Sequence, residues 1–260
     1  MRVALTIAGS DSGGGAGIQA DLKTFHRFGV FGTSAIAAIT AQNTLGVTEW
    51  EGVAPRLVRA QIDAVATDLF PAAVKSGMLP TADIIAVVAK AIRTHELRNY
   101  VLDPVMVATS GDLLIKPDAV AAIREQLIPL AELVTPNADE AAVLAGFPVD
   151  DEESMRRAAE EILGLGARAV LIKGGHVQSA DAPTVIDVLF DGEFHTFRHS
   201  RIDTTSTHGT GCTLSAGVAA QLALGSSLRD AVASAIDFVH AAMESAPGLG
   251  RGHGPLNHFA

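Results

Sequence analysis

The segment that precedes the last two predicted helices combines residue types suited to holding and transferring an anionic group. It reads Asp203-Thr-Thr-Ser-Thr-His-Gly-Thr-Gly-Cys212, and an apolar helical pattern follows it. Gly209 and Gly211, with Thr210 between them, allow the backbone amides to converge on one point. The helix adds its own unpaired amides and the positive end of its dipole. We therefore expect an anion site at this junction.

Cys212, the only cysteine, lies at the start of that helix. Amides at a helix N-terminus lower a thiol pKa, so the sequence predicts a thiolate that accepts a proton or attacks an electrophile. A cysteine protease would also need a positioned histidine, and the spacing of His208 does not place its ring. The ordinary alternative for a lone cysteine is a small buried hydrophobic residue.

A glycine-rich segment follows the first apolar strand. Residues 15–20 match the dinucleotide pattern GxGxx[GA], but the second strand ends in Thr40-Ala-Gln-Asn43, without the acidic residue that this motif requires. We interpret Gly9 and its neighbours as a close backbone approach to a small ligand, with a flexible turn as the alternative. Gln42 has an amide donor and acceptor for the edge of a heterocycle, or is a solvated loop amide.

Other candidates follow later strands. Met78 and Val105 either wall the same crevice or are core side chains. Lys173 ends a strand, where an ammonium neutralises phosphate oxygens or is simply solvated. Asn137 and Glu140, at i and i+3 of a helix start, are suited either to a hydrated Mg²⁺ near phosphates or to a helix cap.

Composition limits the class of protein. The chain has 260 residues, of which 48% are hydrophobic, and a net charge of −10. This length favours one domain, 1–260, and the charge makes nucleic acid an improbable partner. One cysteine forms no internal disulfide, no secretory signal pattern is evident, and the apolar runs are too short to span a bilayer. We expect a cytoplasmic protein without membrane contact.

Apolar strands alternate with amphipathic helices along the chain. This pattern predicts an α/β fold with a mostly parallel sheet covered on both faces, and Asp191-Gly192 predicts one antiparallel hairpin, 184–190 with 193–198. The other predicted strands are 3–7, 34–40, 73–76, 100–103, 133–135 and 169–173; the helices are 18–28, 56–69, 83–94, 118–126, 138–144, 152–163, 213–224 and 228–244.

Several of these segments together resemble one family, the hydroxymethylpyrimidine/phosphomethylpyrimidine kinases of thiamine biosynthesis. The resemblance implies a ribokinase-like three-layer α/β/α sandwich, ATP with Mg²⁺, and a homodimer. It also implies two phosphorylations, first of 4-amino-5-hydroxymethyl-2-methylpyrimidine and then of its monophosphate. The motifs that carry it are Ala8-Gly-Ser-Asp-Ser-Gly-Gly-Gly-Ala-Gly-Ile-Gln-Ala-Asp-Leu-Lys-Thr24, Thr40-Ala-Gln-Asn43, Val101-Leu-Asp-Pro-Val-Met106, Val134-Thr-Pro-Asn-Ala-Asp-Glu140, Lys173-Gly-Gly-His176, His208-Gly-Thr-Gly-Cys-Thr-Leu-Ser215 and Gly252-His-Gly-Pro-Leu-Asn-His258.

The resemblance also implies residue roles. Most ribokinase-like kinases have Gly-Ala-Gly-Asp where this chain has Gly209-Thr-Gly-Cys212, so cysteine replaces the aspartate that acts as general base. Gly209, Thr210 and Gly211 would receive developing charge, and Lys173 would contact the transferring phosphate. In the remaining roles, Gln42 would bind the aminopyrimidine, Gly9, Asp21, Met78 and Val105 would surround or support it, and Asn137 and Glu140, assisted by Asp103, would bind metal.

Two alternatives remain open. Pyridoxal also has a hydroxymethyl group on a flat nitrogen heterocycle, so the chain could be a pyridoxal or pyridoxine kinase of the same fold. It could also be a binding protein that has lost turnover. Segments 43–46 and 107–113 leave strands at the crevice and contain glycine, and they are the candidates for lids.

Overall fold

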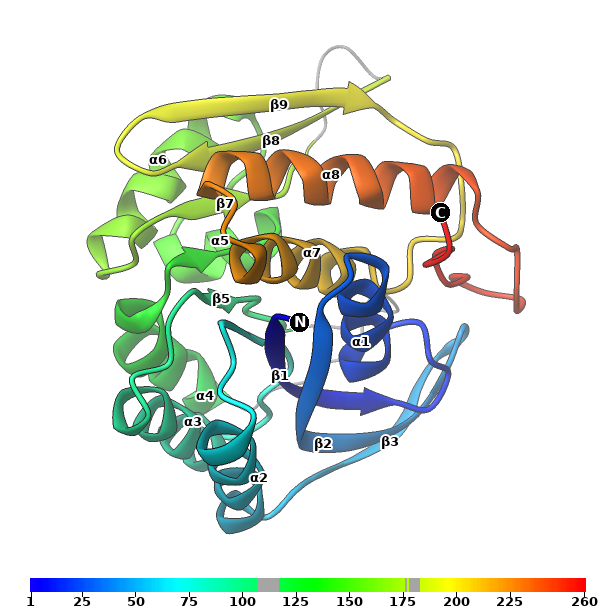
Figure 1. The fold of residues 1–260 in the computed structure, drawn as a ribbon. Coiled ribbons are helices and arrows are strands. Elements are labelled where there is room, and N and C mark those ends of the chain that lie inside the picture. The colour runs from blue at the N-terminus through cyan, green and yellow to red at the C-terminus, as the bar shows by residue number, and fades with distance from the viewer. Residues whose placement is uncertain (107–116, 176, 178–182) are drawn as a thin grey trace.

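The computed structural model describes residues 1–106, 117–175, 177 and 183–260 (Figure 1). In this part of the chain one nine-stranded sheet runs in the order β3-β2-β1-β4-β5-β6-β7-β8-β9. The pairs from β2 through β1, β4, β5 and β6 to β7 are parallel, and β3, β8 and β9 pair antiparallel. The strands are β1 (Val3–Asp11), β2 (Phe31–Asn43), β3 (Gly46–Gly52), β4 (Ala73–Ser76), β5 (Tyr100–Leu102), β6 (Leu133–Val134), β7 (Val170–Ile172), β8 (Thr184–Phe190) and β9 (Phe194–Ser200).

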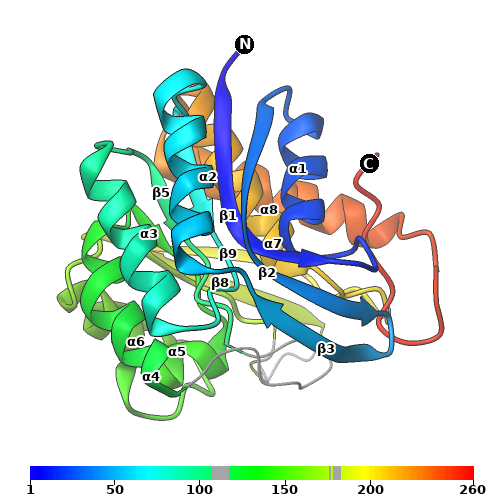
Figure 2. The same ribbon diagram turned by 90° about the horizontal axis from the view of Figure 1, so that it is seen from below.

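Helices cover both faces of the sheet, which makes three layers (Figure 2). Successive strand residues alternate between the two cores: Ala4 packs with the core under α1, α7 and α8, while Leu5 packs with the core under the other helices. The first set comprises α1 (Gly17–Arg27), α7 (Thr210–Leu224) and α8 (Leu228–Glu244); the second comprises α2 (Pro55–Asp68), α3 (Ala82–Thr94), α4 (Pro117–Ala122), α5 (Ala138–Ala145) and α6 (Glu152–Gly164).

The predicted fold class is confirmed, and the elements differ from prediction in detail. β1 continues through the first glycine to Asp11, with a register shift between Ala8 and Gly9, so the loop is shorter than expected. β3 was not predicted, and it gives the sheet a second antiparallel hairpin. The predicted helix 118–126 is α4 followed by a π-helical turn, Ile123–Leu127, and a 3₁₀ turn, Ile128–Leu130. The proposed lid segment 107–113 lies outside the described residues.

The sheet order reverses at β1, which lies between β2 and β4. In α/β sheets a ligand crevice forms beyond the carboxyl ends of the strands at such a reversal. The residues that follow β1, β2, β4, β5 and β7 therefore share one edge. Among the described residues, no helix is long and apolar enough to cross a membrane.

Candidate functional site

A cavity of about 1130 Å³ opens at this edge of the sheet. It gathers residues from distant parts of the sequence, because six parallel strands end there and three helices, α1, α5 and α7, begin there. All the predicted site residues except Asp21 line it: Gly9, Gln42, Met78, Asp103, Val105, Asn137, Glu140, Lys173, Gly209, Thr210, Gly211 and Cys212.

The two glycine-rich segments pack directly against each other at this cavity. Gly209 has φ +85°, and a Cβ there would lie 1.9 Å from the Gly15 carbonyl oxygen. Gly17 has φ +56°, and a Cβ there would lie 2.3 Å from the Gly9 carbonyl oxygen. Only glycine fits both the conformation and the space. This contact brings the N-termini of α1 and α7 together, so amides of both helices face one end of the cavity.

The Cys212 thiol lies where these two helix starts meet. Its pKa is raised to about 11, chiefly by burial and also by the carboxylates of Asp21 and Asp103, although the Lys75 ammonium and the Gly17 N–H oppose the rise. The predicted thiolate is therefore wrong for the ligand-free protein, because removal from water outweighs the helix amides. At neutral pH Cys212 is a thiol that can orient a hydroxyl group.

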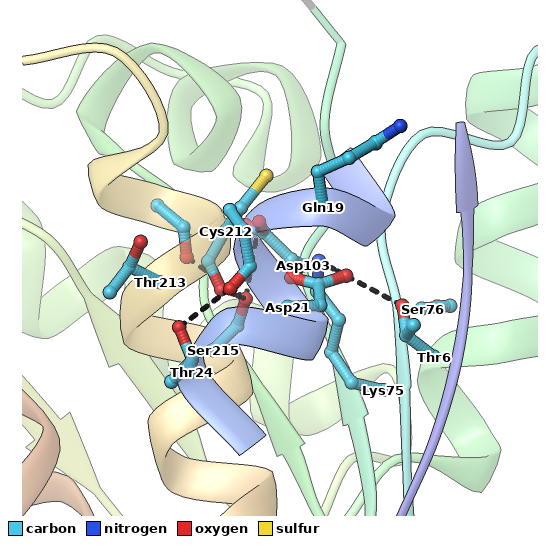
Figure 3. Close-up of polar contacts among 12 residues, drawn as sticks. Thr6, Gln19, Asp21, Thr24, Lys75, Ser76, Asp103, Cys212, Thr213 and Ser215 are labelled. Carbon is cyan, nitrogen blue, oxygen red and sulfur yellow. Dashed lines mark hydrogen bonds and ion pairs between the residues drawn. The ribbon is translucent and has the colours of Figure 1, made fainter. Parts of the chain in front are cut away.

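Asp21 does not reach the cavity, which corrects its expected place around the substrate. Its side chain is fully buried in α1, where it accepts hydrogen bonds from Thr6 Oγ1 at 2.5 Å and from Lys75 Nζ at 2.9 Å (Figure 3). Lys75 lies in β4, one residue before its end, and is also fully buried. The pair lies between the sheet and the start of α7, so it supports the floor beneath Cys212.

Lys173 lies between two carboxylates. Its Nζ is 3.1 Å from Asp103 Oδ1 and 3.9 Å from Glu140 Oε2. Burial lowers the Lys173 pKa, but the two carboxylates outweigh this and the net pKa is raised. The Lys173 N–H donates to the Pro136 carbonyl at 2.9 Å, which fixes this residue beside the start of α5. The ammonium is therefore charged and faces the cavity.

Asn137 and Glu140 form a reciprocal cap at the start of α5. Asn137 Oδ1 accepts from the Glu140 N–H at 2.8 Å, and Glu140 Oε2 accepts from the Asn137 N–H at 2.8 Å. Burial raises the Glu140 pKa to about 7, and Lys173 limits that rise. The helix-cap interpretation is confirmed, and the metal interpretation stays a prediction; the cap holds the Glu140 carboxylate at the cavity wall.

These side chains fit Mg²⁺ only as a partly hydrated ion. No group of three or more His, Cys, Asp or Glu side chains in the described residues is placed to enclose a metal. Mg²⁺ commonly binds through one or two carboxylates, with waters and substrate phosphates as the other ligands. Asp103 and Glu140 supply two carboxylates on one wall, so the donor set matches that mode. The Asn137 oxygen is used in the cap.

The end of the cavity near β1 and β2 is suited to a small flat ring. Gln42 brings a primary amide to it, and Met78 and Val105 add apolar surface. A Cβ on Gly9 would lie 3.0 Å from Met78 Sδ, so glycine lets this methionine lie against the strand. The opposite end, near β8 and α8, is walled by apolar side chains, among them Val185, Val239 and Met243, and by polar ones, among them His199, Arg201 and His240.

Two buried polar pairs, one beneath the cavity and one at its wall, escaped the sequence analysis as pairs. Lys75 lies inside an ordinary apolar strand pattern, and only its polarity within four buried residues could have marked it. Asp11 and His208 are 2.8 Å apart although 197 positions separate them, so no local signal joins them. The His208 backbone N–H donates to Gly254 at 3.1 Å, which gives the C-terminal glycine motif a role in holding this loop.

Comparisons with known proteins agree with this geometry. The family model of phosphomethylpyrimidine kinase matches residues 11–257. The hydroxymethylpyrimidine/phosphomethylpyrimidine kinase of Rhizobium meliloti (strain 1021) is 54% identical over 261 residues, which cover 99% of this chain and 97% of that protein.

Solved structures are similar over the whole fold. The ADP complex of Bacillus subtilis pyridoxal kinase has a TM-score of 0.91 and 41% identity, with 100% of this chain and 98% of that chain covered. Phosphomethylpyrimidine kinase from Clostridium difficile 630 has a TM-score of 0.83 and 40% identity, with 93% and 99% covered. These likenesses confirm the expected ribokinase-like fold. Together with the match of the family model, they lead to one conclusion: the chain belongs to the phosphomethylpyrimidine kinase family of phosphotransferases.

Proposed function

We propose that this protein transfers the γ-phosphoryl group of ATP to the hydroxymethyl oxygen of 4-amino-5-hydroxymethyl-2-methylpyrimidine, and then a second phosphoryl group to the monophosphate. One observation carries this proposal: a single cavity joins an end with an amide and apolar walls to a glycine loop beside Lys173 and Cys212. The product would serve thiamine synthesis, and residues 1–260 would act as one kinase domain.

The pyrimidine would lie against Gln42, with Met78 and Val105 on its faces. Its hydroxymethyl group would then point toward Cys212, at the meeting of α1 and α7. The nucleobase of ATP would occupy the opposite end, near Val185 and Val239. This arrangement brings the two reacting groups together, which is the main requirement of phosphoryl transfer.

In the transfer step the substrate hydroxyl oxygen bonds to the γ-phosphorus as the bond from that phosphorus to the ADP oxygen breaks. As the new bond forms, the hydroxyl proton passes to a non-bridging oxygen of the transferring phosphoryl group, and ADP leaves with the oxygen of the broken bond. The Lys173 ammonium would face the charge on the transferring group, and amides at the start of α7 would point at its oxygens. Cys212, a thiol at neutral pH, orients the hydroxyl, because a loose transition state needs little prior deprotonation.

Asp103 and Glu140 would hold Mg²⁺ through water and phosphate oxygens, and Asn137 would position Glu140 through the cap. The bound ion would neutralise charge on the phosphates. Lys173, 3.1 Å from Asp103, already balances part of the carboxylate charge there.

Pyridoxal is the second candidate acceptor, because the pyridoxal kinase of Bacillus subtilis shares the fold at a TM-score of 0.91. Consumption of ATP with each of the two alcohols tests the assignment directly. We expect kcat/KM to be at least about tenfold higher for the aminopyrimidine than for pyridoxal, since a hydrogen-bonding site discriminates strongly between rings with different donors and acceptors on their edges. A preference of the same size for pyridoxal would overturn it.

We further propose that two copies associate through the surface around the end of β2. Ile39, near the end of this strand, is 60% exposed, and Leu45 in the following turn is also 60% exposed. Large exposed apolar side chains commonly mark a contact between proteins. Sedimentation equilibrium of the wild type and of Ile39→Lys tests this, and a wild-type monomer at all concentrations would refute it.

A further inference from the structure

A buried pair, Asp11 and His208, stands directly behind Gln42. His208 Nε2 lies 2.8 Å from Asp11 Oδ2, and the two residues are 7% and 3% exposed. Gly15 makes room for the imidazole, because a Cβ at that position would lie 2.5 Å from His208 Cδ2. The ring is therefore held from both sides in one orientation.

The proton in this pair lies on His208 Nε2. Asp11 Oδ2 also accepts the N–H groups of Gly15 at 2.9 Å and Ala16 at 2.8 Å, so the carboxylate acts as an acceptor. Burial raises the Asp11 pKa, but His208 and the backbone donors outweigh it and hold the pKa below its usual range. An ionised carboxylate donates no hydrogen, so the imidazole must.

This proton conflicts with one orientation of the Gln42 amide. Gln42 Nε2 lies 3.3 Å from His208 Nε2, which would place two N–H donors against each other. Gln42 Oε1 lies 3.2 Å from Thr40 Oγ1, whose single proton has a better-placed acceptor in the Ser10 carbonyl at 3.0 Å. A half-turn of the amide exchanges two nearly isosteric ends and resolves both conflicts.

We propose that His208, held by Asp11, fixes the Gln42 amide with its oxygen toward the imidazole and its nitrogen toward Thr40, and thereby sets the order of donor and acceptor that the substrate ring meets. In this network every N–H or O–H group meets an acceptor, and no two donors face each other. Gln42 Nε2–H donates to Thr40 Oγ1, Thr40 O–H donates to Ser10, and His208 Nε2–H is shared by Asp11 and Gln42 Oε1.

The fixed amide has a selective consequence, which rests on the proposed function's use of Gln42 as a substrate contact. One Nε2–H on the Thr40 side and one Oε1 lone pair on the His208 side remain for the ligand. A 4-aminopyrimidine edge has an N–H donor beside a ring-nitrogen acceptor and can match that order. The 4-oxo analogue has a carbonyl acceptor beside a ring N–H and presents the opposite order.

Steady-state kinetics of the full-length enzyme with the 4-aminopyrimidine alcohol and with its 4-oxo analogue tests the proposal. The wild type should favour the amino over the oxo substrate in kcat/KM by about 100-fold or more, because unmatched buried polar groups are costly. In His208→Phe, which keeps a ring but loses the N–H, this ratio should fall at least about tenfold, with most of the change in KM. His253→Phe alters another histidine on the cavity wall and should leave the ratio unchanged.

A purely structural role of His208 would lower kcat/KM for both substrates equally, and an unchanged ratio in His208→Phe would overturn the proposal.

A second measurement requires no substrate and no active variant. In the ligand-free wild type, the Gln42 amide protons, assigned by their loss in Gln42→Glu, should show nuclear Overhauser contacts to the Thr40 methyl group. Contacts to the His208 ring in place of Thr40 would overturn the inference even if the kinase activity is confirmed. Conversely, failure of the wild type to phosphorylate either pyrimidine would refute the proposed function alone.

Discussion

Lys75 Nζ lies 2.9 Å from both carboxylate oxygens of Asp21, and neither side chain is exposed to solvent. The pair joins β4 to α1 directly below the start of α7 (Figure 3). Because two charges are removed from water together, each one requires the other. The packing of β4 and α1 beneath Cys212 therefore depends on this ion pair.

The Lys75→Met variant should lower the free energy of unfolding by about 3–5 kcal/mol, because it leaves the Asp21 carboxylate buried without its counter-ion. The double variant Lys75→Met with Asp21→Asn should recover part of this loss. Urea unfolding of the two single variants and the double variant measures the coupling. Additive losses would contradict an interaction between these residues.

Alkylation of Cys212 should be slow at neutral pH and should accelerate about tenfold per pH unit until about pH 11, because burial raises the thiol pKa to about 11 and only the thiolate reacts. Cys212 is the only cysteine, so incorporation of iodoacetamide measures this site alone. In urea the same thiol should titrate near an ordinary cysteine pKa of about 8.5. Rapid alkylation of the folded protein at pH 7 would contradict the raised pKa and support the thiolate that the sequence predicted.

Replacement of Lys173 by alanine should slow phosphoryl transfer by about 10²–10³-fold, because it removes the ammonium that faces the transferring charge. The Kd of the aminopyrimidine should change by less than about threefold, since the ring binds elsewhere in the cavity. Rapid-quench single turnovers and calorimetry separate the two quantities. Lys23→Ala is a matched control, because the exposed Lys23 ammonium donates to the Gly14 carbonyl in the glycine segment. If Lys173→Ala instead weakened binding of the aminopyrimidine and left the transfer rate unchanged, Lys173 would be assigned to binding of the substrate ring.

The stability contributed by Glu140 should depend on pH in a defined direction. Burial raises its pKa from 4.5 to about 7, so the folded state binds more protons than the unfolded state between these values. Stability therefore falls as pH rises through this window and is level above it. Glu140→Gln keeps the cap and removes the titration, so relative to the wild type it should gain about 3 kcal/mol between pH 5 and pH 8.

Urea unfolding in EDTA measures this difference without metal. Glu152→Gln is the opposite control, because Arg156 and Arg198 hold the Glu152 pKa below its usual range. That carboxylate stabilises the fold above its ordinary pKa and loses this effect as the pH falls through its lowered value. Parallel pH profiles of the two variants would exclude a raised Glu140 pKa.

The repeated strands and amphipathic helices were predictable, because the central strands are short apolar runs buried at every residue, whereas the helices bury only one face. β3 was not, since its sequence includes Gly46, Glu49 and Glu51 and gives no apolar run; pairing with β2 stabilises it. The end of β1 was also obscured, because Gly9 reads as a break. There the glycine allows a close contact with Met78 inside a continuing strand.

The site was predictable where single residues follow strands, as with Lys173 and Gln42. The charge state of Cys212 was not, because it depends on burial and on Lys75, Asp21 and Asp103, which the fold brings together from three other elements. The roles of Asp11 and His208 escaped prediction for the same reason. Residue types name candidate chemistry, but long-range neighbours decide which protonation state is present.

The contact between Asp11 and His208 joins positions 197 residues apart. During synthesis on a ribosome, β1 and β2 emerge long before the imidazole that completes their binding surface, and loops of this length close late. A partly made chain can form the early βαβ units, yet its glutamine amide remains free to rotate. We therefore expect vitamin-precursor recognition to mature only near the end of translation.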